Sequence, residues 1–392
     1  MFNKIKESYF LSQPHQPFFL LGIFNALVMM LIFGLAYKGI FNLVVDARIF
    51  HSFSLIFLLF SNVFTGFLFT TFPRFNQTSV IEKDFYIALF STNALGSLLF
   101  IVASFTNIYA LASAMFLLFI SQILMVYKLH QIYKSGLAPD KSDSFWILIA
   151  NYFGLLGNFL FLLSLFLPTL INFAVNISFY LYLIFLAFSV GQRMIPFFSH
   201  SFAVKNPHFV NITLALLLLK TLFASLDIKL LEIVVDVFLT LFLAKEFYRW
   251  ELKPFQSPPI LWVLHLALAW LPLAFFLSAL SLILELLGDT SFYFFNTHLL
   301  AIGFLTTLLI GFGTRVTLGH SGQPPHGDSF ATKIFLFIQF VVLGRAIFSI
   351  NVAYGWEANF LFDISFTLWL LLFLVWGGRY AQVLLFGKKL SS

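Results

Sequence analysis

Histidines in or beside long apolar runs are the residues of this sequence best suited to chemistry. His298 lies within the membrane-length apolar stretch that begins at Phe295, and His51 opens another such stretch. Burying an imidazole in an apolar span costs free energy unless a partner satisfies it. An ionisable residue in such a span therefore indicates a functional site, and its partners should come from neighbouring helices.

Two arginines accompany these histidines at a similar predicted depth. Arg48 comes one turn before His51, and Arg345 lies in the outer third of a later span. Two imidazoles can bind a haem iron on its two faces, and guanidinium groups pair with the propionates. His51, His298, Arg48 and Arg345 are therefore candidate haem-binding residues. The alternative is structural: His298 bonds a nearby carbonyl, His51 is interfacial and Arg345 extends to the surface.

A second polar group is predicted at the cytoplasmic ends of the helices. Arg315 and His320 lie in the segment Gly-Thr-Arg-Val-Thr-Leu-Gly-His-Ser-Gly, which we expect to be a polar turn. Arg193 ends another span, and His265 lies inside a third. Imidazole suits copper, so His265 and His320 are candidate copper ligands, and the same donors could hold nitrogen-oxide ligands. Solvated loop residues are the alternative for His320 and also for His15.

Opposite charges in two neighbouring spans form a third group. If the turn between them lies near residues 226–228, Lys220 and Asp236 fall at similar depths and pair across the hairpin. Glu232 and Asp236 are four residues apart, on one helix face. The group is either a structural ion pair or part of a proton or ion route.

Composition defines the class of protein that holds these residues. The chain of 392 residues is 60% hydrophobic and 10% charged, whereas a soluble domain carries roughly a quarter charged residues. The absence of cysteine excludes disulfides, thiolate ligands, iron–sulfur clusters and a CxxCH haem attachment. The net charge of +6 belongs to short loops and not to a nucleic-acid-binding face. The sequence is that of an integral protein of a lipid bilayer.

Twelve apolar runs are long enough, at about 20 residues each, to cross a bilayer as helices. We therefore predict an all-α, polytopic membrane helical bundle that forms a single integral membrane domain over residues 1–392. Most of the 22 Lys and Arg lie in alternate loops, which predicts that both termini are cytoplasmic. The predicted spans lie near residues 18–37, 51–72, 85–103, 108–127, 145–167, 171–190, 209–226, 229–244, 259–283, 292–313, 331–350 and 359–377.

Three arginines end predicted helices two, six and ten. Arg74 and Arg193 are 119 residues apart (193 − 74), and Arg193 and Arg315 are 122 apart (315 − 193). This spacing is consistent with three groups of four helices. Without any repeat, the positive-inside rule and the negative helix C-terminus also favour arginine at such positions.

The motif Thr-Arg-x-Thr-Leu-Gly-His at residues 314–320 is accompanied by several shorter motifs along the chain. With them, the sequence resembles the NnrS family of polytopic membrane proteins over nearly its whole length. The residues that carry the resemblance are His298, Gly303, Thr314-Arg315, Thr317-Leu318-Gly319-His320, Gly322, and residues 16–19, 66–68, 191–198 and 265–272.

The resemblance implies about twelve helices, an association with haem b and copper, and a role in tolerance of nitric oxide under nitrosative stress. It also implies the bacterial inner membrane, with respiratory or denitrification proteins as partners. The chain departs from the family at the start of its second helix, where the family has His-x-His-Glu. His51 matches the first histidine, but Phe53 and Ser54 replace the second histidine and the glutamate. One potential metal ligand and its acidic neighbour are therefore missing.

The sequence leaves two other functions open, and it does not decide whether a reaction is catalysed. A secondary transporter would use a proton or small-ion path through predicted helices 7, 8 and 11. A membrane sensor or an assembly factor for a respiratory complex is the other alternative. A looser analogy favours haem, because subunit I of haem–copper oxidases holds a haem on histidines of its second and tenth helices, where His51 and His298 are predicted here.

Overall fold

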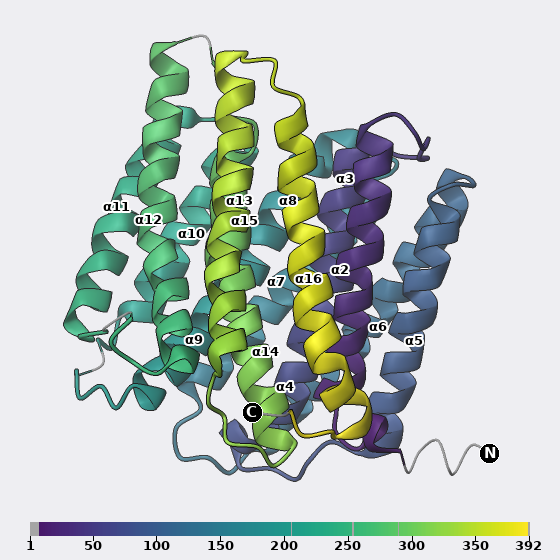
Figure 1. Cartoon of the computed structure of the whole chain (residues 1–392), viewed down its shortest axis with the longest axis vertical. Coiled ribbons are helices and arrows are strands. Elements are labelled where there is room, and N and C mark those ends of the chain that lie inside the picture. The colour runs from purple at the N-terminus through teal and green to yellow at the C-terminus, as the bar shows by residue number, and fades with distance from the viewer. Residues whose placement is uncertain (1–7, 205, 253–254, 289, 391–392) are drawn as a thin grey trace. The chain divides into compact units, whose positions relative to one another are not determined.

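The computed structural model describes residues 8–204, 206–252, 255–288 and 290–390. These residues form helices and connecting segments, with no strand among them (Figure 1), so the all-α prediction is confirmed. Within the described ranges, ten helices are long and apolar enough to cross a membrane. The helix of the seventh predicted span, Phe209–Ser225, is apolar but shorter. The helix of the eighth predicted span, Lys229–Arg249, carries charged residues near its middle and at both ends.

The chain divides into two compact units. Unit 1 comprises Met1–Leu183, Val316–Gln323 and Gly377–Ser392, and unit 2 comprises Ile184–Arg315 and Pro324–Trp376. In chain order the helices are η1 (Tyr9–Leu11), α2 (His15–Tyr37), α3 (Ala47–Phe53), η2 (Ser54–Phe60), α4 (Ser61–Asn76), α5 (Lys83–Ala103), α6 (Ile108–Ser135), α7 (Ser142–Ser164), η3 (Pro168–Leu170), α8 (Ile171–Asn176), η4 (Ile177–Ile184), α9 (Phe185–Phe198), α10 (Phe209–Ser225), α11 (Lys229–Arg249), α12 (Pro259–Leu287), α13 (Phe295–His298), η5 (Leu299–Thr306), α14 (Thr307–His320), α15 (Ser329–Tyr354) and α16 (Phe360–Phe386).

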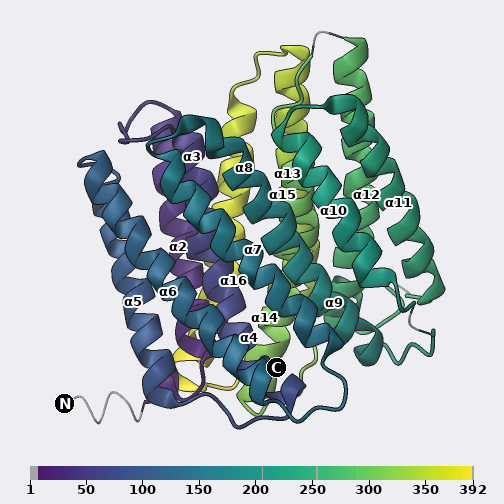
Figure 2. The ribbon, with the colours of Figure 1, turned by 180° about the vertical axis from the view of Figure 1, so that it is seen from behind.

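Close approach of helices at glycine organises unit 1. A Cβ atom added at Gly66 of α4 would lie 2.8 Å from Phe18 Cβ and 3.1 Å from His15 Cα, both on α2. Helices α5 and α6 lie side by side (Figure 2), with Leu118 of α6 packed on Gly96 of α5. Small residues allow this close packing in membrane proteins, where apolar surface alone gives helices little reason to associate.

In unit 2, α11 and α12 lie side by side (Figure 1). The indole of Trp270, on α12, covers Gly303 of η5, where an added Cβ would lie 2.6 Å from Trp270 Cδ2. Trp270 Nε1 donates a hydrogen bond to Gln339 Oε1 of α15 at 2.7 Å. One partly buried indole therefore connects three helical segments, and only glycine leaves room for it.

Among the described residues, three helices contain a π-helical segment: η2, η4 and η5. They begin at residues 54, 177 and 299, at separations of 123 (177 − 54) and 122 (299 − 177) residues. Hydroxyl groups bond carbonyls five residues back, as in Ser61 Oγ to Ile56 O at 2.9 Å and Thr306 Oγ1 to Ala301 O at 2.8 Å. These are the second, sixth and tenth helices, which also end near the three spaced arginines. The π segments therefore support three groups of four helices.

The prediction of a polar turn around Arg315 and His320 is wrong, because α14 continues to His320. The buried face of α14 also extends into this segment, because Thr314 is fully buried and Leu318 is only 5% exposed. The helix ends only where Gly322 adopts a left-handed φ of 70°. Arg315 and His320 are therefore five residues apart on one helix and point in different directions.

Candidate functional site

A first candidate site lies in unit 2, where His298 and Arg345 meet one short backbone segment. His298 Nδ1 lies 2.8 Å from Phe294 O, and because a carbonyl only accepts, Nδ1 carries the proton. Arg345 Nη2 donates to Tyr293 O at 3.0 Å, and Nη1 donates to Ser349 Oγ. The imidazole and the guanidinium are thus bound to carbonyls of consecutive residues.

The backbone of this segment is strained. Tyr293 and Phe294 have φ values of 33° and 57°, in the left-handed region that non-glycine residues avoid. Such a residue costs about 1–3 kcal/mol and persists only where surrounding contacts hold it. The guanidinium carbon of Arg345 lies 5.9 Å from the centre of the Tyr293 ring and 5.2 Å from that of Phe348. These contacts and hydrogen bonds hold the segment in place.

The other two residues predicted for haem, His51 and Arg48, belong to unit 1. The ring centre of His51 lies 4.1 Å from that of Phe33 on α2. Arg48 is exposed and pairs with Asp46, with Nε 3.0 Å from Oδ1. Asp46 also caps α3 by accepting a bond from the Arg48 backbone N–H at 2.7 Å. The side-chain bond from Arg48 lowers the pKa of the Asp46 carboxyl.

Phe53, at the position where the resemblance predicts a second histidine, is packed in the core of unit 1. Its side chain is 1% exposed, and its ring centre lies 5.1 Å from those of Phe57 and Phe100 and 5.6 Å from that of Phe161. Ser54 Oγ donates to His51 O at 3.2 Å. The two replaced positions therefore contribute to core packing and to a local helix bond, and they offer no imidazole or carboxylate.

A second candidate site lies in unit 1, where His15 and His320 are neighbours. Their ring centres are 4.8 Å apart, with planes inclined at 43°. His15 is 1% exposed, and its Nδ1 is buried without a hydrogen bond among the described residues. Arg74, at the end of α4, is close enough to interact electrostatically with both imidazoles. The solvated-loop alternative is wrong for His15.

His15 is buried because α2 begins earlier than the apolar run predicted. The carboxamide Oε1 of Gln16 accepts bonds from Ser12 Oγ at 2.9 Å and from the Gln13 backbone N–H at 2.8 Å, which stabilises the start of the helix. The residues Ser12, Pro14 and Gln16 are the sequence signal of this helix start. They locate His15 on the first turn, but they do not show which residue faces it.

Of the predicted polar site of Arg193, His265, Arg315 and His320, the first three belong to unit 2, where His265 and Arg315 contact neighbouring residues at the end of α9. His265 is 2% exposed, and its Nε2 lies 2.7 Å from Ser199 Oγ. The guanidinium carbon of Arg315 lies 3.9 Å from the centre of the Phe198 ring. Arg193 is on the same helix, one and a half turns earlier. Across the described parts of the chain, no group of three or more His, Cys, Asp or Glu residues is placed to hold a metal ion.

The contact between Arg315 and Phe198 gives a first testable prediction. We expect Phe198→Leu to lower the free energy of unfolding by about 0.5–2 kcal/mol, because leucine has no π face for the guanidinium. Phe197→Leu is the matched control, since that side chain is 76% exposed. Thermal unfolding of the detergent-purified variants measures both effects. Equal midpoints for the two variants would contradict a stabilising contact.

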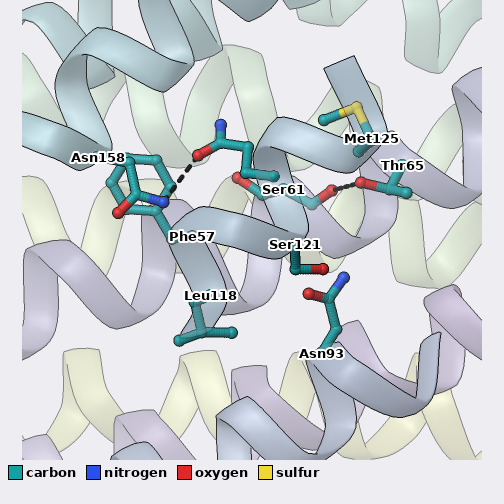
Figure 3. Close-up of a pocket in the computed structure, with 9 residues that line it drawn as sticks. Phe57, Ser61, Thr65, Asn93, Leu118, Ser121, Met125 and Asn158 are labelled. Atoms are coloured by element: carbon teal, nitrogen blue, oxygen red, sulfur yellow. Dashed lines mark hydrogen bonds between the residues drawn. The ribbon is translucent and has the colours of Figure 1, made fainter. Parts of the chain in front are cut away.

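A small cavity lined partly by polar side chains lies inside unit 1 (Figure 3), and it was not predicted from the sequence. Its volume of about 20 Å³ is enough for a water molecule. Asn158 Nδ2 donates to Gln122 Oε1 at 2.7 Å, whereas Ser121 Oγ and Asn158 Oδ1 make no hydrogen bond among the described residues. Polar residues inside apolar spans were the available signal, but the spans alone do not show that these side chains converge. The lining residues are Phe57, Ser61, Thr65, Asn93, Leu118, Ser121, Gln122, Met125 and Asn158.

The fold and these side chains define a class: a polytopic helical membrane protein with histidines and arginines near the ends of its helices, three of which contain π-helical segments. The family model described as NnrS protein matches residues 9–386, nearly the whole chain. The chain belongs to the NnrS family. None of the curated proteins compared with it matches.

Proposed function

We propose that this NnrS protein binds haem b through His298 and contributes to tolerance of nitric oxide in the bacterial inner membrane, with both termini in the cytoplasm. One observation carries the proposal. His298 and Arg345 are bound to the carbonyls of Phe294 and Tyr293, two consecutive residues in a strained left-handed conformation. Strain of this kind is concentrated at functional sites.

The donor set of this site fits a haem. The Nδ1–H of His298 donates to a carbonyl, so in the neutral imidazole Nε2 carries the lone pair that binds a metal. Arg345 is 8% exposed and brings a positive charge beside the same segment, where it could pair with a propionate. Bound haem iron would supply a coordination site for nitric oxide. The roles predicted for His51 and Arg48 stay predictions.

His15 and His320 support a separate proposal for copper. Imidazole is a good copper ligand, and the two rings lie against each other in unit 1. Nδ1 of His15 is a buried nitrogen that makes no hydrogen bond in the described structure, and a metal would give it a partner. His265 is not part of this copper proposal, because its Nε2 already bonds Ser199 Oγ. Its role as a copper ligand stays a prediction. Respiratory or denitrification proteins are the proposed partners.

The absorption spectrum of the purified protein tests the haem proposal. We expect protein from cells supplied with haem precursor to show a Soret band that moves when nitric oxide is added. His298→Ala should reduce haem content several-fold, because it removes the proposed iron ligand. His326→Ala is the matched control, since that histidine is exposed in the segment after α14.

A parent protein without a Soret band, or a His298→Ala variant with full haem content, would overturn the haem proposal. The cellular role is tested separately. Cells that lack the protein should grow more slowly under a nitric oxide donor than cells that carry it, and equal growth would argue against a role in tolerance.

A further inference from the structure

A buried lysine lies between two carboxylates in unit 2. Lys220 Nζ, on α10, is 2.6 Å from Glu232 Oε1 and 2.7 Å from Asp236 Oδ2, both on α11. Ser278 Oγ, on α12, donates to the same Asp236 Oδ2 at 2.6 Å. The predicted pairing of Lys220 with Asp236 is confirmed. We infer that these residues form a proton-binding site, in which Asp236 takes up and releases one proton.

The charges of the group are unbalanced without such a proton. Lys220 and Asp236 are fully buried, and Glu232 is 5% exposed. One ammonium and two carboxylates leave a net charge of −1, and an uncompensated buried charge costs several kcal/mol. A structural ion pair would need only one carboxylate. Adding a proton to the second makes the group neutral.

Asp236 has an oxygen that can receive the proton. The hydrogen bonds from Lys220 and Ser278 both go to Oδ2. Oδ1 is buried and makes no hydrogen bond among the described residues. A proton from water can therefore add to Oδ1 and leave again without breaking either bond to Oδ2. No electron transfer or other bond change is required.

Glu232 lies between Asp236 and the N-terminal end of α11. Glu232 is three residues from the helix start, about 4.5 Å along the axis, and lies between Lys229 and Asp236. Lys229 Nζ is 3.0 Å from Glu285 Oε2, and the Lys229 side chain is 33% exposed, so a charged and partly exposed side chain lies at this end of the helix. Glu232 is placed to pass a proton between solvent and Asp236.

The opposite direction along α11 is apolar. After Thr240, whose Oγ1 bonds Asp236 O at 2.8 Å, the buried face continues with Leu243 before Glu246. A proton that reaches Asp236 from the N-terminal end of α11, at Lys229, therefore does not have to pass Leu243. The charged or titratable residues of the three helices, with the turn between α10 and α11, are Lys220, Asp227, Lys229, Glu232, Asp236, Lys245, Glu246, Tyr248, Arg249, His265 and Glu285.

Infrared difference spectroscopy of the full-length protein in lipid nanodiscs tests this inference. Lowering the pH should increase a C=O stretching band of a protonated carboxylic acid, and the band should shift in D₂O. Asp236→Asn should remove this band and keep the fold, because Lys220 and Glu232 remain a neutral pair. Glu246→Gln is the control: Glu246 is a buried carboxylate of the same helix, paired with Arg249 at 2.8 Å, and its variant should retain the band.

The inference would be overturned by a spectrum in which no carboxylic acid band titrates. It would also be overturned by a band that fails to shift in D₂O, or by one that survives unchanged in a folded Asp236→Asn variant. If Asp236→Asn does not fold, Asp236→Glu gives the decisive comparison. That variant should move the band frequency and not abolish it.

Discussion

Lys220→Met is expected to lower the free energy of unfolding by about 3–5 kcal/mol, because it leaves two carboxylates buried without their cation. Lys220 Nζ is within 2.7 Å of both Glu232 and Asp236 and is fully buried. The loss should be smaller in acid than at neutral pH, since protonation neutralises the two carboxylates. Thermal unfolding of the detergent-purified protein at several pH values measures both effects.

Two further variants show whether charge is responsible for this loss. Lys245→Met, at an exposed position of the neighbouring helix α11, should change stability by less than about 0.5 kcal/mol. The triple variant Lys220→Met, Glu232→Gln, Asp236→Asn should recover much of the stability, because no unpaired charge remains. A triple variant as unstable as Lys220→Met would show that lost packing, and not the unpaired charge, causes the effect.

Gly66→Ala is expected to lower the free energy of unfolding by about 1–3 kcal/mol through overpacking. The new Cβ would lie 2.8 Å from Phe18 Cβ and 3.1 Å from His15 Cα. Neither atom can move away by a side-chain rotation, so α2 must shift relative to α4. The same shift would carry His15 away from its present position beside His320, and metal analysis should then show reduced copper if these histidines bind it.

Gly378→Ala is the matched control for Gly66→Ala. Gly378 is in the interior of α16, and an added Cβ there would have no atom within 4 Å. Alanine should be neutral or stabilise the helix by up to about 1 kcal/mol. If the two substitutions lowered the unfolding temperature equally, the close approach of α2 and α4 would not be the cause.

The sequence by itself determined the helices and one of their ion pairs. Apolar length is a local property, and each predicted span overlaps a helix of the structure. Lys220 and Asp236 could be paired in advance because a short turn fixes the relative depth of two neighbouring helices. Arginine spacing also pointed to a repeat, which the positions of η2, η4 and η5 support.

Only the tertiary structure decided which side chains meet. His15 and His320 are 305 residues apart (320 − 15), and nothing in either local sequence identifies the other as its neighbour. The polar residues between positions 313 and 322 predicted a turn. Burial of Thr314 and Leu318 instead keeps the segment helical as far as His320. Arg345 and His298 converge because Tyr293 and Phe294 adopt a strained conformation that contacts from α15 help to hold. Local sequence sets helix length and depth, whereas packing between distant segments sets the direction in which each side chain points.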